Sequence, residues 1–220
     1  MRSFQFQTGE YYHIYNRGVD KRDVFMDDED YLRFLRSMRE FNNIEAEGGL
    51  YMKYLRETKE RGGDLISSLE IKSQNRLVEF ISYCLNPNHF HFLIKQVVEN
   101  GITKFIQKIS IGYTMYFNQK YSRSGSLFQG TYKAIHVDDD GYLLKLLVYI
   151  NCNYEIHNLG KAEKWPWSSC LDSIGVRKGT LCNLGIVNEE FGNGIEFKNF
   201  CREILPEIKE NKTLSKFLLE

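Results

Sequence analysis

The chain has 220 residues and a formal net charge of zero, with 42% hydrophobic and 14% aromatic residues. This composition provides for a packed core and excludes an intrinsically disordered protein, which would have few apolar residues and a high net charge. The zero net charge also excludes nucleic-acid binding through the field of the whole molecule, so any such binding needs a local basic patch.

The number and spacing of the cysteines and the length of the apolar runs indicate the cellular compartment. Five cysteines are an odd number, and none forms a Cys-x-x-Cys pair. This argues against a disulfide framework and against a cysteine zinc site. Residues 1–10 contain no apolar signal segment, and no apolar run approaches the length that crosses a membrane. We therefore expect a soluble cytoplasmic protein with reduced thiols and no membrane partner.

The first third of the chain predicts a strand, a helix and an insertion. Residues 11–16 are aromatic and branched, which favours a strand. Apolar residues then recur at helical spacing from Tyr31 to Phe41, and Asp27 or Asp28 could cap this helix. Residues 45–76 are more polar and are interrupted by glycines, which indicates an irregular or partly helical insertion.

A β-hairpin is predicted next, with strands at residues 77–85 and 89–96. The Asn-Pro-Asn between them favours a turn, because proline fixes φ and asparagine side chains bond their own backbone. Helical spacing of apolar residues predicts a helix over 102–121, and residues 132–137 are expected to form a further strand.

The last part of the chain predicts mostly helix. Three aspartates at 138–140 can cap a helix over about 142–154. Residues 165–169 form a tryptophan-containing loop, and 197–219 is expected to be helical again.

The order of these elements predicts an α+β fold. Strand, helix, hairpin, helix, strand and helix are typical of a ferredoxin-like antiparallel sheet with helices packed on one face. A C-terminal helical extension would follow. We expect the main domain to span residues 1–157, including the insertion, and the extension to span 158–220.

Two histidines, His89 and His91, lie one residue apart on the second strand of the hairpin. Because side chains alternate along a strand, both imidazoles face one way and the neighbouring phenylalanines face the other. Such a pair can supply two ligands to a divalent cation, or it can be the wet face of an amphipathic strand. His13 and His136 could approach the cleft but are expected to be structural, and His157 is expected at the surface.

The helix over 142–154 offers a third ligand. Tyr149 and Asn153 are four residues apart and share one helical face. The amide oxygen of Asn153 could complete a His-His-Asn site suited to Mg²⁺ or Mn²⁺, with the phenol of Tyr149 beside the cation. The chain has fourteen tyrosines. The pattern alone does not select Tyr149 over Tyr113 or Tyr116, which are expected to pack in the core.

Two segments are candidates for DNA contact. Residues 101–133 contain only cations among their charged residues, interleaved with aromatic side chains, and a second basic cluster follows the first strand. This pattern is typical of phosphate contact and base stacking on single-stranded DNA, and it also fits a solvated helix face above a core. Lys120 and Arg123 are the favoured phosphate contacts. The candidate residues are Arg17, Lys21, Arg22, Lys104, Lys108, Lys120, Arg123 and Lys133.

Together these motifs resemble the single-tyrosine HUH transposases, and most closely the REP-associated tyrosine transposase-like (IS200-like) proteins. The resemblance covers most of the chain, in the family's order and spacing. It is carried by YHIYNRGVDKRDVF (12–25), DYLRFL (30–35), LNPNHFHFLI (85–94), YTMYFNQKYSRSGSLFQGTYKAI (113–135), YLLKLLVYINCN (142–153) and WPWSS (165–169).

The resemblance implies an activity and its residues. It implies a divalent metal, Mg²⁺ or Mn²⁺, bound by His89, His91 and Asn153, and a nucleophilic Tyr149. The implied reaction is cleavage and rejoining of single-stranded, hairpin-bearing or palindromic DNA through a 5′-phosphotyrosine. Related proteins include monomers and swapped homodimers, in which the tyrosine serves the histidines of the partner.

Two features depart from the family pattern. Asn153 is followed by Tyr154 where the family has Pro-Val, and the insertion at 45–76 is longer than usual. The alternative function, from a different class, is a non-catalytic nucleic-acid-binding module on a ferredoxin-like fold.

Overall fold

The computed structural model describes residues 5–44 and 75–210. Most of the insertion expected at 45–76, and the end of the helix expected at 197–219, lie outside the described residues.

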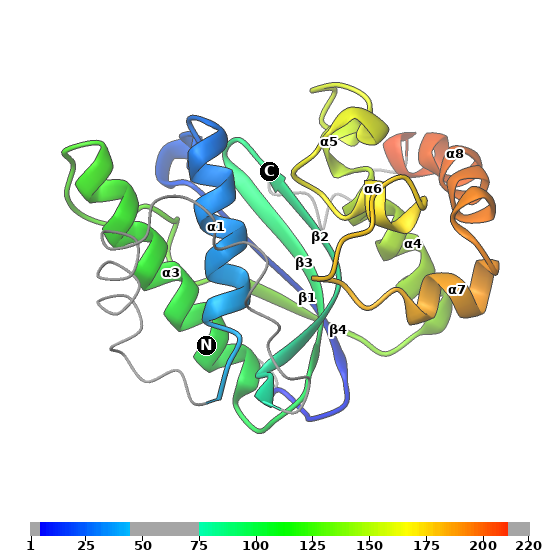
Figure 1. Cartoon of the computed structure of the whole chain (residues 1–220), viewed down its shortest axis with the longest axis horizontal. Helices are drawn as coiled ribbons and strands as arrows, with labels where there is room; N and C mark the ends of the chain where they lie inside the picture. The colour runs from blue at the N-terminus through cyan, green and yellow to red at the C-terminus, as the bar shows by residue number, and fades with distance from the viewer. Residues whose placement is uncertain (1–4, 45–74, 211–220) are drawn as a thin grey trace.

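Four antiparallel strands form one sheet in the order β2-β3-β1-β4 (Figure 1). Among the described residues, α1 lies between β1 and β2 and α3 lies between β3 and β4, which is the arrangement of the ferredoxin-like fold. The predicted α+β class is therefore confirmed. The elements of this unit are β1 (Tyr11–Arg17), α1 (Asp28–Glu40), β2 (Val78–Asn86), β3 (His89–Gln96), α3 (Gly101–Lys120) and β4 (Lys133–Val137).

Hydrogen bonds explain where α1 begins and how the loop after β1 is held. The carboxylate of Asp27 accepts a hydrogen bond from the backbone N–H of Asp30 at 3.0 Å and caps α1. β2 and β3 are joined by a two-residue turn, Pro87-Asn88, and the backbone N–H of Gly18 donates to the carbonyl of Asn88 at 2.8 Å. The loop after β1 is thereby held against the hairpin turn.

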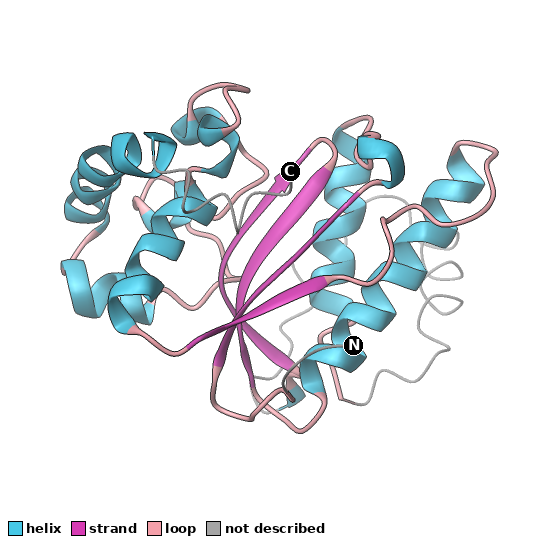
Figure 2. Cartoon of the chain, turned by 180° about the vertical axis from the view of Figure 1, so that it is seen from behind, coloured by secondary structure: helices cyan, strands magenta, loops and turns pink. Residues whose placement is uncertain are grey.

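Helices cover both faces of the sheet. Figures 1 and 2 show α1 and α3 on one side, as the sequence predicts, and α4 (Asp140–Asn151) with the later helices on the other. Phe92 belongs to the buried cluster that includes residues of α1 and α3, whereas Leu93 belongs to the cluster that includes Leu147 and Val148 of α4. α4 therefore adds a second layer to the ferredoxin-like unit.

The C-terminal extension packs directly on α4. Its longest helix, α8 (Gly194–Glu210), buries Phe197, Cys201 and Ile208 in the same cluster as α4. The domain boundary at residue 157 stays a prediction. The shorter elements are η1 (Val19–Lys21), α5 (Asn153–Ile156), η3 (Ala162–Lys164), α6 (Cys170–Ser173) and α7 (Gly185–Phe191).

The helix expected over 142–154 is interrupted at Cys152, where φ is −98° and ψ is 9°. The side-chain amide of Asn151 donates to the carbonyl of Leu147 at 2.9 Å, one turn back. Such bonds from an asparagine to its own helix compete with regular backbone pairing. α4 therefore ends at Asn151, and Asn153 begins the short helix α5.

All five cysteines are free thiols, as expected from their spacing. In the part of the chain that the structure describes, no helix has the length and apolar character needed to span a membrane.

Candidate active site

The two predicted histidines lie on the face of the sheet that α4 covers. In the sheet register His89 pairs with Arg17 on β1 and Asn86 on β2, whereas His91 pairs with Tyr15 and Cys84. Because partners across a sheet point to the same face, each imidazole has a neighbour on both sides. The alternation predicted for this strand is the observed one.

His89 lies beside the predicted third ligand. Its Nδ1 is 2.6 Å from the side-chain oxygen of Asn88, so Nδ1–H donates to Asn88 and leaves Nε2 as an acceptor. Nε2 lies 3.0 Å from Oδ1 of Asn153, which is itself an acceptor, and the amide of Asn86 donates to both atoms. Two acceptors side by side, with the other imidazole nitrogen held by an oxygen, form the donor arrangement that suits a divalent cation.

His91 presents an unpaired nitrogen in the same region. Its Nδ1 lies 2.8 Å from Nε2 of His13, and the two rings stack with centroids 5.0 Å apart. Its Nε2 is buried and has no hydrogen-bond partner among the described residues, and neither does the side-chain nitrogen of Asn153. Buried polar atoms are nearly always paired, so an orphaned imidazole nitrogen fits a position where a metal binds.

The donor set is two imidazoles and an amide. Among the described residues there is no cluster of three or more His, Cys, Asp or Glu side chains that could hold a metal. Only two of the three predicted ligands, His89 and His91, are of those types, and Asn153 is the third.

The phenol of Tyr149 lies next to the histidines of its own chain. Its ring stands perpendicular to that of His91 with centroids 5.4 Å apart, and the residue is 1% exposed. Burial raises the pKa of Tyr149, and the neighbouring side chain of Asn153 acts in the opposite direction. In this arrangement the phenol is neutral at physiological pH.

The imidazoles are neutral as well. Burial lowers the pKa of His13 and of His89 to about 3, and it holds the pKa of His91 well below its usual range. Metal ligation requires a neutral imidazole, so burial keeps both predicted ligands in the competent form.

Sequence patterns missed two members of this cluster. His13, expected to be structural, contacts His91 directly. His157, expected at the surface, is half-buried with its ring centroid 4.7 Å from that of His89. Strand alternation places His13 and Tyr15 on one face of β1, but only the pairing of β1 with β3 shows that this face is shared with His91.

Five of the predicted DNA contacts lie at the end of the sheet where His89 is found. Arg17 pairs with His89, and the exposed Lys133 pairs with Tyr15, which pairs with His91. Residues 21–22 follow β1, and the amide of Asn88 in the hairpin turn donates to the carbonyl of Lys21. Arg123 donates to the carbonyl of Ser126, and the next residue, Leu127, accepts from the N–H of Val19, just after β1. The group at this end therefore consists of Arg17, Lys21, Arg22, Arg123 and Lys133.

The other three cations are placed differently. Lys104 and Lys108 lie near the start of α3, which packs beside Leu77 at the opposite end of β2 from His89. The ammonium of Lys120 lies 2.8 Å from the carboxylate of Asp27 and 2.9 Å from that of Asp30, with Glu29 at 3.1 Å. Lys120 is neutralised by these acids, so the structure does not favour it as a phosphate contact.

Comparisons with known proteins bear on the family and on the fold. Residues 52–153 match the family model described as "Transposase IS200 like". No curated protein sequence matches the chain. A solved structure of a REP-associated tyrosine transposase bound to a REP hairpin superposes with a TM-score of 0.52 over 84% of this chain and 94% of that chain, at 11% identity.

At that identity the structural likeness shows the fold. The family match covers β2, β3, α3, β4 and α4 and ends at Asn153. The resemblance that the motifs indicate is therefore confirmed: the chain carries the sequence pattern of the IS200-like transposases over residues 52–153, on the fold of a REP-associated tyrosine transposase.

Proposed function

We propose that this protein is a transposase, active or domesticated, that cuts and rejoins single-stranded DNA through a 5′-phosphotyrosine. The observation that carries the proposal is the meeting of four side chains: the Tyr149 ring stands against His91, whose Nε2 is orphaned, and Nε2 of His89 lies 3.0 Å from Oδ1 of Asn153.

In this proposal His89, His91 and Asn153 hold Mg²⁺ or Mn²⁺. The chemistry supplied by the bound ion is Lewis-acid activation of the scissile phosphate. The phenol oxygen of Tyr149 attacks phosphorus, the bond to the 3′ oxygen breaks, and the phenol proton ends on the released 3′-hydroxyl. Attack of a 3′-hydroxyl on the phosphotyrosine reverses the step, so rejoining needs no external energy.

The substrate proposed is hairpin-bearing single-stranded DNA. The structural neighbour is bound to a REP hairpin, and the cations at the His89 end of the sheet can contact phosphates. Because His91 and Tyr149 are fully buried, a phosphate reaches them only after neighbouring groups move. We place this activity in the cytoplasm, where the five free thiols stay reduced.

A labelled hairpin oligonucleotide tests the proposal. Incubation with wild-type protein and Mg²⁺ or Mn²⁺, followed by a denaturing gel, is expected to give a covalent 5′-linked adduct. Tyr149→Phe is expected to give none while hairpin affinity changes little, because only the attacking oxygen is removed. Full adduct formation by Tyr149→Phe would contradict the assignment of the nucleophile. A wild-type protein that binds DNA without metal dependence or adduct would instead be a binding module.

A further inference from the structure

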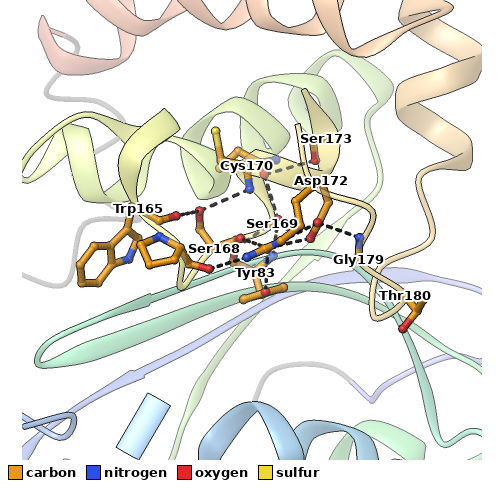
Figure 3. A network of polar contacts seen from close by, with 12 residues as sticks. Tyr83, Trp165, Ser168, Ser169, Cys170, Asp172, Ser173, Gly179 and Thr180 are labelled. Atoms are coloured by element: carbon orange, nitrogen blue, oxygen red, sulfur yellow. Dashed lines mark hydrogen bonds and ion pairs between the residues drawn. The ribbon is translucent and has the colours of Figure 1, made fainter. Parts of the chain in front are cut away.

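The WPWSS loop lies along the edge of the sheet next to the site. The backbone N–H of Leu85 on β2 donates to the carbonyl of Trp167, and that of Ser169 donates to the carbonyl of Tyr83, both at 2.9 Å. The hydroxyl of Ser169 also accepts from the N–H of Tyr83 at 2.9 Å. The loop therefore binds the edge strand β2 at Tyr83 (Figure 3). β2 ends at Asn86.

An arginine from the extension closes this loop on itself. The guanidinium of Arg177 donates to both carboxylate oxygens of Asp172, at 2.7 and 2.8 Å, and to the carbonyls of Pro166 and Ser168, both at 2.6 Å. Asp172 also accepts from the N–H of Gly179 at 3.0 Å, where an added Cβ would lie 2.6 Å from the carboxylate. Residues 165–177, named the brace below, are thus fixed at several points.

The brace reaches the end of α4 through a buried serine. Ser169 Oγ donates to the side-chain oxygen of Asn151 at 2.8 Å, and Ser173 Oγ lies 3.4 Å from the same oxygen. Asn151 is fully buried, two residues after Tyr149 and two before Asn153.

A second contact holds the start of α5. The indole of Trp165 donates to the carbonyl of Leu85 at 3.0 Å and stacks on Tyr154 with ring centroids 3.8 Å apart and planes within 6°. Tyr154 is the residue that departs from the family pattern, and it directly follows Asn153. The brace therefore connects β2, which ends at Asn86, to Asn151 before Asn153 and to Tyr154 after it.

We propose that the brace positions Tyr149 and Asn153 against the two histidines, with Ser169 and Asn151 as positioning residues. This inference rests on the proposed function, in which Tyr149 and Asn153 are residues of the active site. α4 stops at Asn151, and Asn153 Oδ1 lies next to His89 two residues later. Ser169 makes the shorter of the two hydroxyl contacts to Asn151. Displacement of reactive groups by about 1 Å can cost on the order of 100-fold in rate, so this contact matters to the chemistry.

The test compares four variants of the brace and of the residues that it contacts with a matched control. Ser169→Ala, Asn151→Ala and the double variant remove the contact from either side. Ser82→Ala removes a serine hydroxyl that is equally buried on β2 and has no hydrogen-bond partner among the described residues. Tyr154→Leu removes the stack on Trp165 and leaves no buried polar atom unpaired, so it keeps the test open if the serine variant folds poorly.

Three quantities are measured: the affinity for Mn²⁺ alone by electron paramagnetic resonance, the single-turnover rate of adduct formation, and the affinity for a hairpin oligonucleotide. Ser169→Ala and Asn151→Ala are each expected to lower Mn²⁺ affinity or adduct rate by about 10- to 100-fold, the usual effect of losing a group that orients a ligand. Their effects should not add in the double variant. Tyr154→Leu should lower the same quantities by about 2- to 10-fold.

Hairpin affinity should stay within about twofold of wild type, because no brace residue is proposed to contact DNA. A Ser169→Ala protein that binds Mn²⁺ and forms adduct like Ser82→Ala would overturn the proposal. If wild-type protein forms no adduct at all, the proposed function fails. The positioning role of the brace is then still tested by whether the affinity for Mn²⁺ depends on Ser169.

Discussion

At the scale of single residues, each imidazole of the pair is held at the nitrogen that faces away from the other predicted ligands. Asn88 takes the Nδ1–H of His89 at 2.6 Å, and His13 lies 2.8 Å from Nδ1 of His91. Groups that hold the second nitrogen of a ligating histidine fix its tautomer and orientation. Alternation predicted which face the histidines occupy, but these partners depend on a turn and on a neighbouring strand.

Removal of the His13 side chain tests this arrangement. His13→Ala is expected to weaken Mn²⁺ binding by about 10- to 100-fold, because His91 loses the partner that orients it. His13→Gln should recover part of the affinity, since its side-chain oxygen can accept from Nδ1–H. Isothermal titration calorimetry measures both. His136→Ala is the control, because His136 lies on β4 and bonds to Glu10; equal affinities of His13→Ala and His136→Ala would refute the role of His13.

Lys120 provides a second prediction at this scale. Its hydrogen bond lowers the pKa of Asp27, and its carboxylate partners raise its own pKa. Asp27 therefore stabilises the folded state above the ordinary pKa of an aspartate, and this stabilisation is lost in acid. Lys120 stabilises the folded state below the ordinary pKa of a lysine, and this stabilisation is lost only in strong base. Lys120→Met should lower the free energy of unfolding at neutral pH by about 1–3 kcal/mol, since the buried Asp30 also loses its ammonium partner.

Chemical denaturation between neutral pH and about pH 3 measures this, and the difference from wild type should shrink below the ordinary pKa of an aspartate, about 4, as Asp27 is protonated. Hairpin affinity should hardly change. Lys104→Met, at an exposed position of the same helix, is the control for stability. A large loss of hairpin affinity with unchanged stability would restore Lys120 as a phosphate contact.

At the scale of elements, most boundaries could be predicted because capping and periodicity are local. Asp139 caps α4 by accepting from the N–H of Tyr142 at 2.6 Å, as the run of aspartates suggests. The end of α4 could not be predicted, because the asparagine that stops it is held by Ser169, eighteen residues away in the chain. The packing of α1 against α3 likewise could not be predicted from local sequence.

The packing of α1 on α3 requires a glycine. A Cβ at Gly112 in the middle of α3 would lie 2.7 Å from the ring of Phe41, the residue that follows α1. Helix propensity alone predicts that alanine stabilises a helix by about 1 kcal/mol relative to glycine. We expect the reverse here: Gly112→Ala should lower the free energy of unfolding by about 1–3 kcal/mol through overpacking.

Urea denaturation checks this, with Gly141→Ala as the matched control. Gly141 lies exposed in the first turn of α4, and its added Cβ would meet only the Asp139 side chain, at 3.4 Å. That variant should be neutral or more stable by up to about 1 kcal/mol. A stabilising Gly112→Ala would show that Phe41 moves aside without cost.

At the scale of the whole molecule, α4 is enclosed between the sheet and the extension. Its residues share a buried cluster with Leu93 on the sheet and with Phe197 on α8. This position places Tyr149 on the histidines of its own chain, so one chain contains the complete candidate site. A swapped homodimer, which the family resemblance leaves open, would need α4 to leave this cluster.

Mixing two inactive variants distinguishes these arrangements. Tyr149→Phe and His91→Ala are each expected to form no adduct, and an equimolar mixture should also form none, because no chain keeps both groups. The denaturing gel of the hairpin assay reads this out, with wild-type protein diluted into Tyr149→Phe as the positive control. Adduct formation by the mixture would mean that the tyrosine of one chain serves the histidines of another.

Local sequence patterns were enough to predict the fold class, the shared face of His89 and His91 and the acidic caps of α1 and α4, because a strand period of two and a capping carboxylate act over a few residues. Three contacts emerge only in the folded chain: His13 holds His91, Asp27 neutralises Lys120 from 93 residues away, and the brace holds Asn151. Each of these contacts joins residues distant in the chain. Their pairing follows from sheet order and from the packing of α4, which no local pattern specifies.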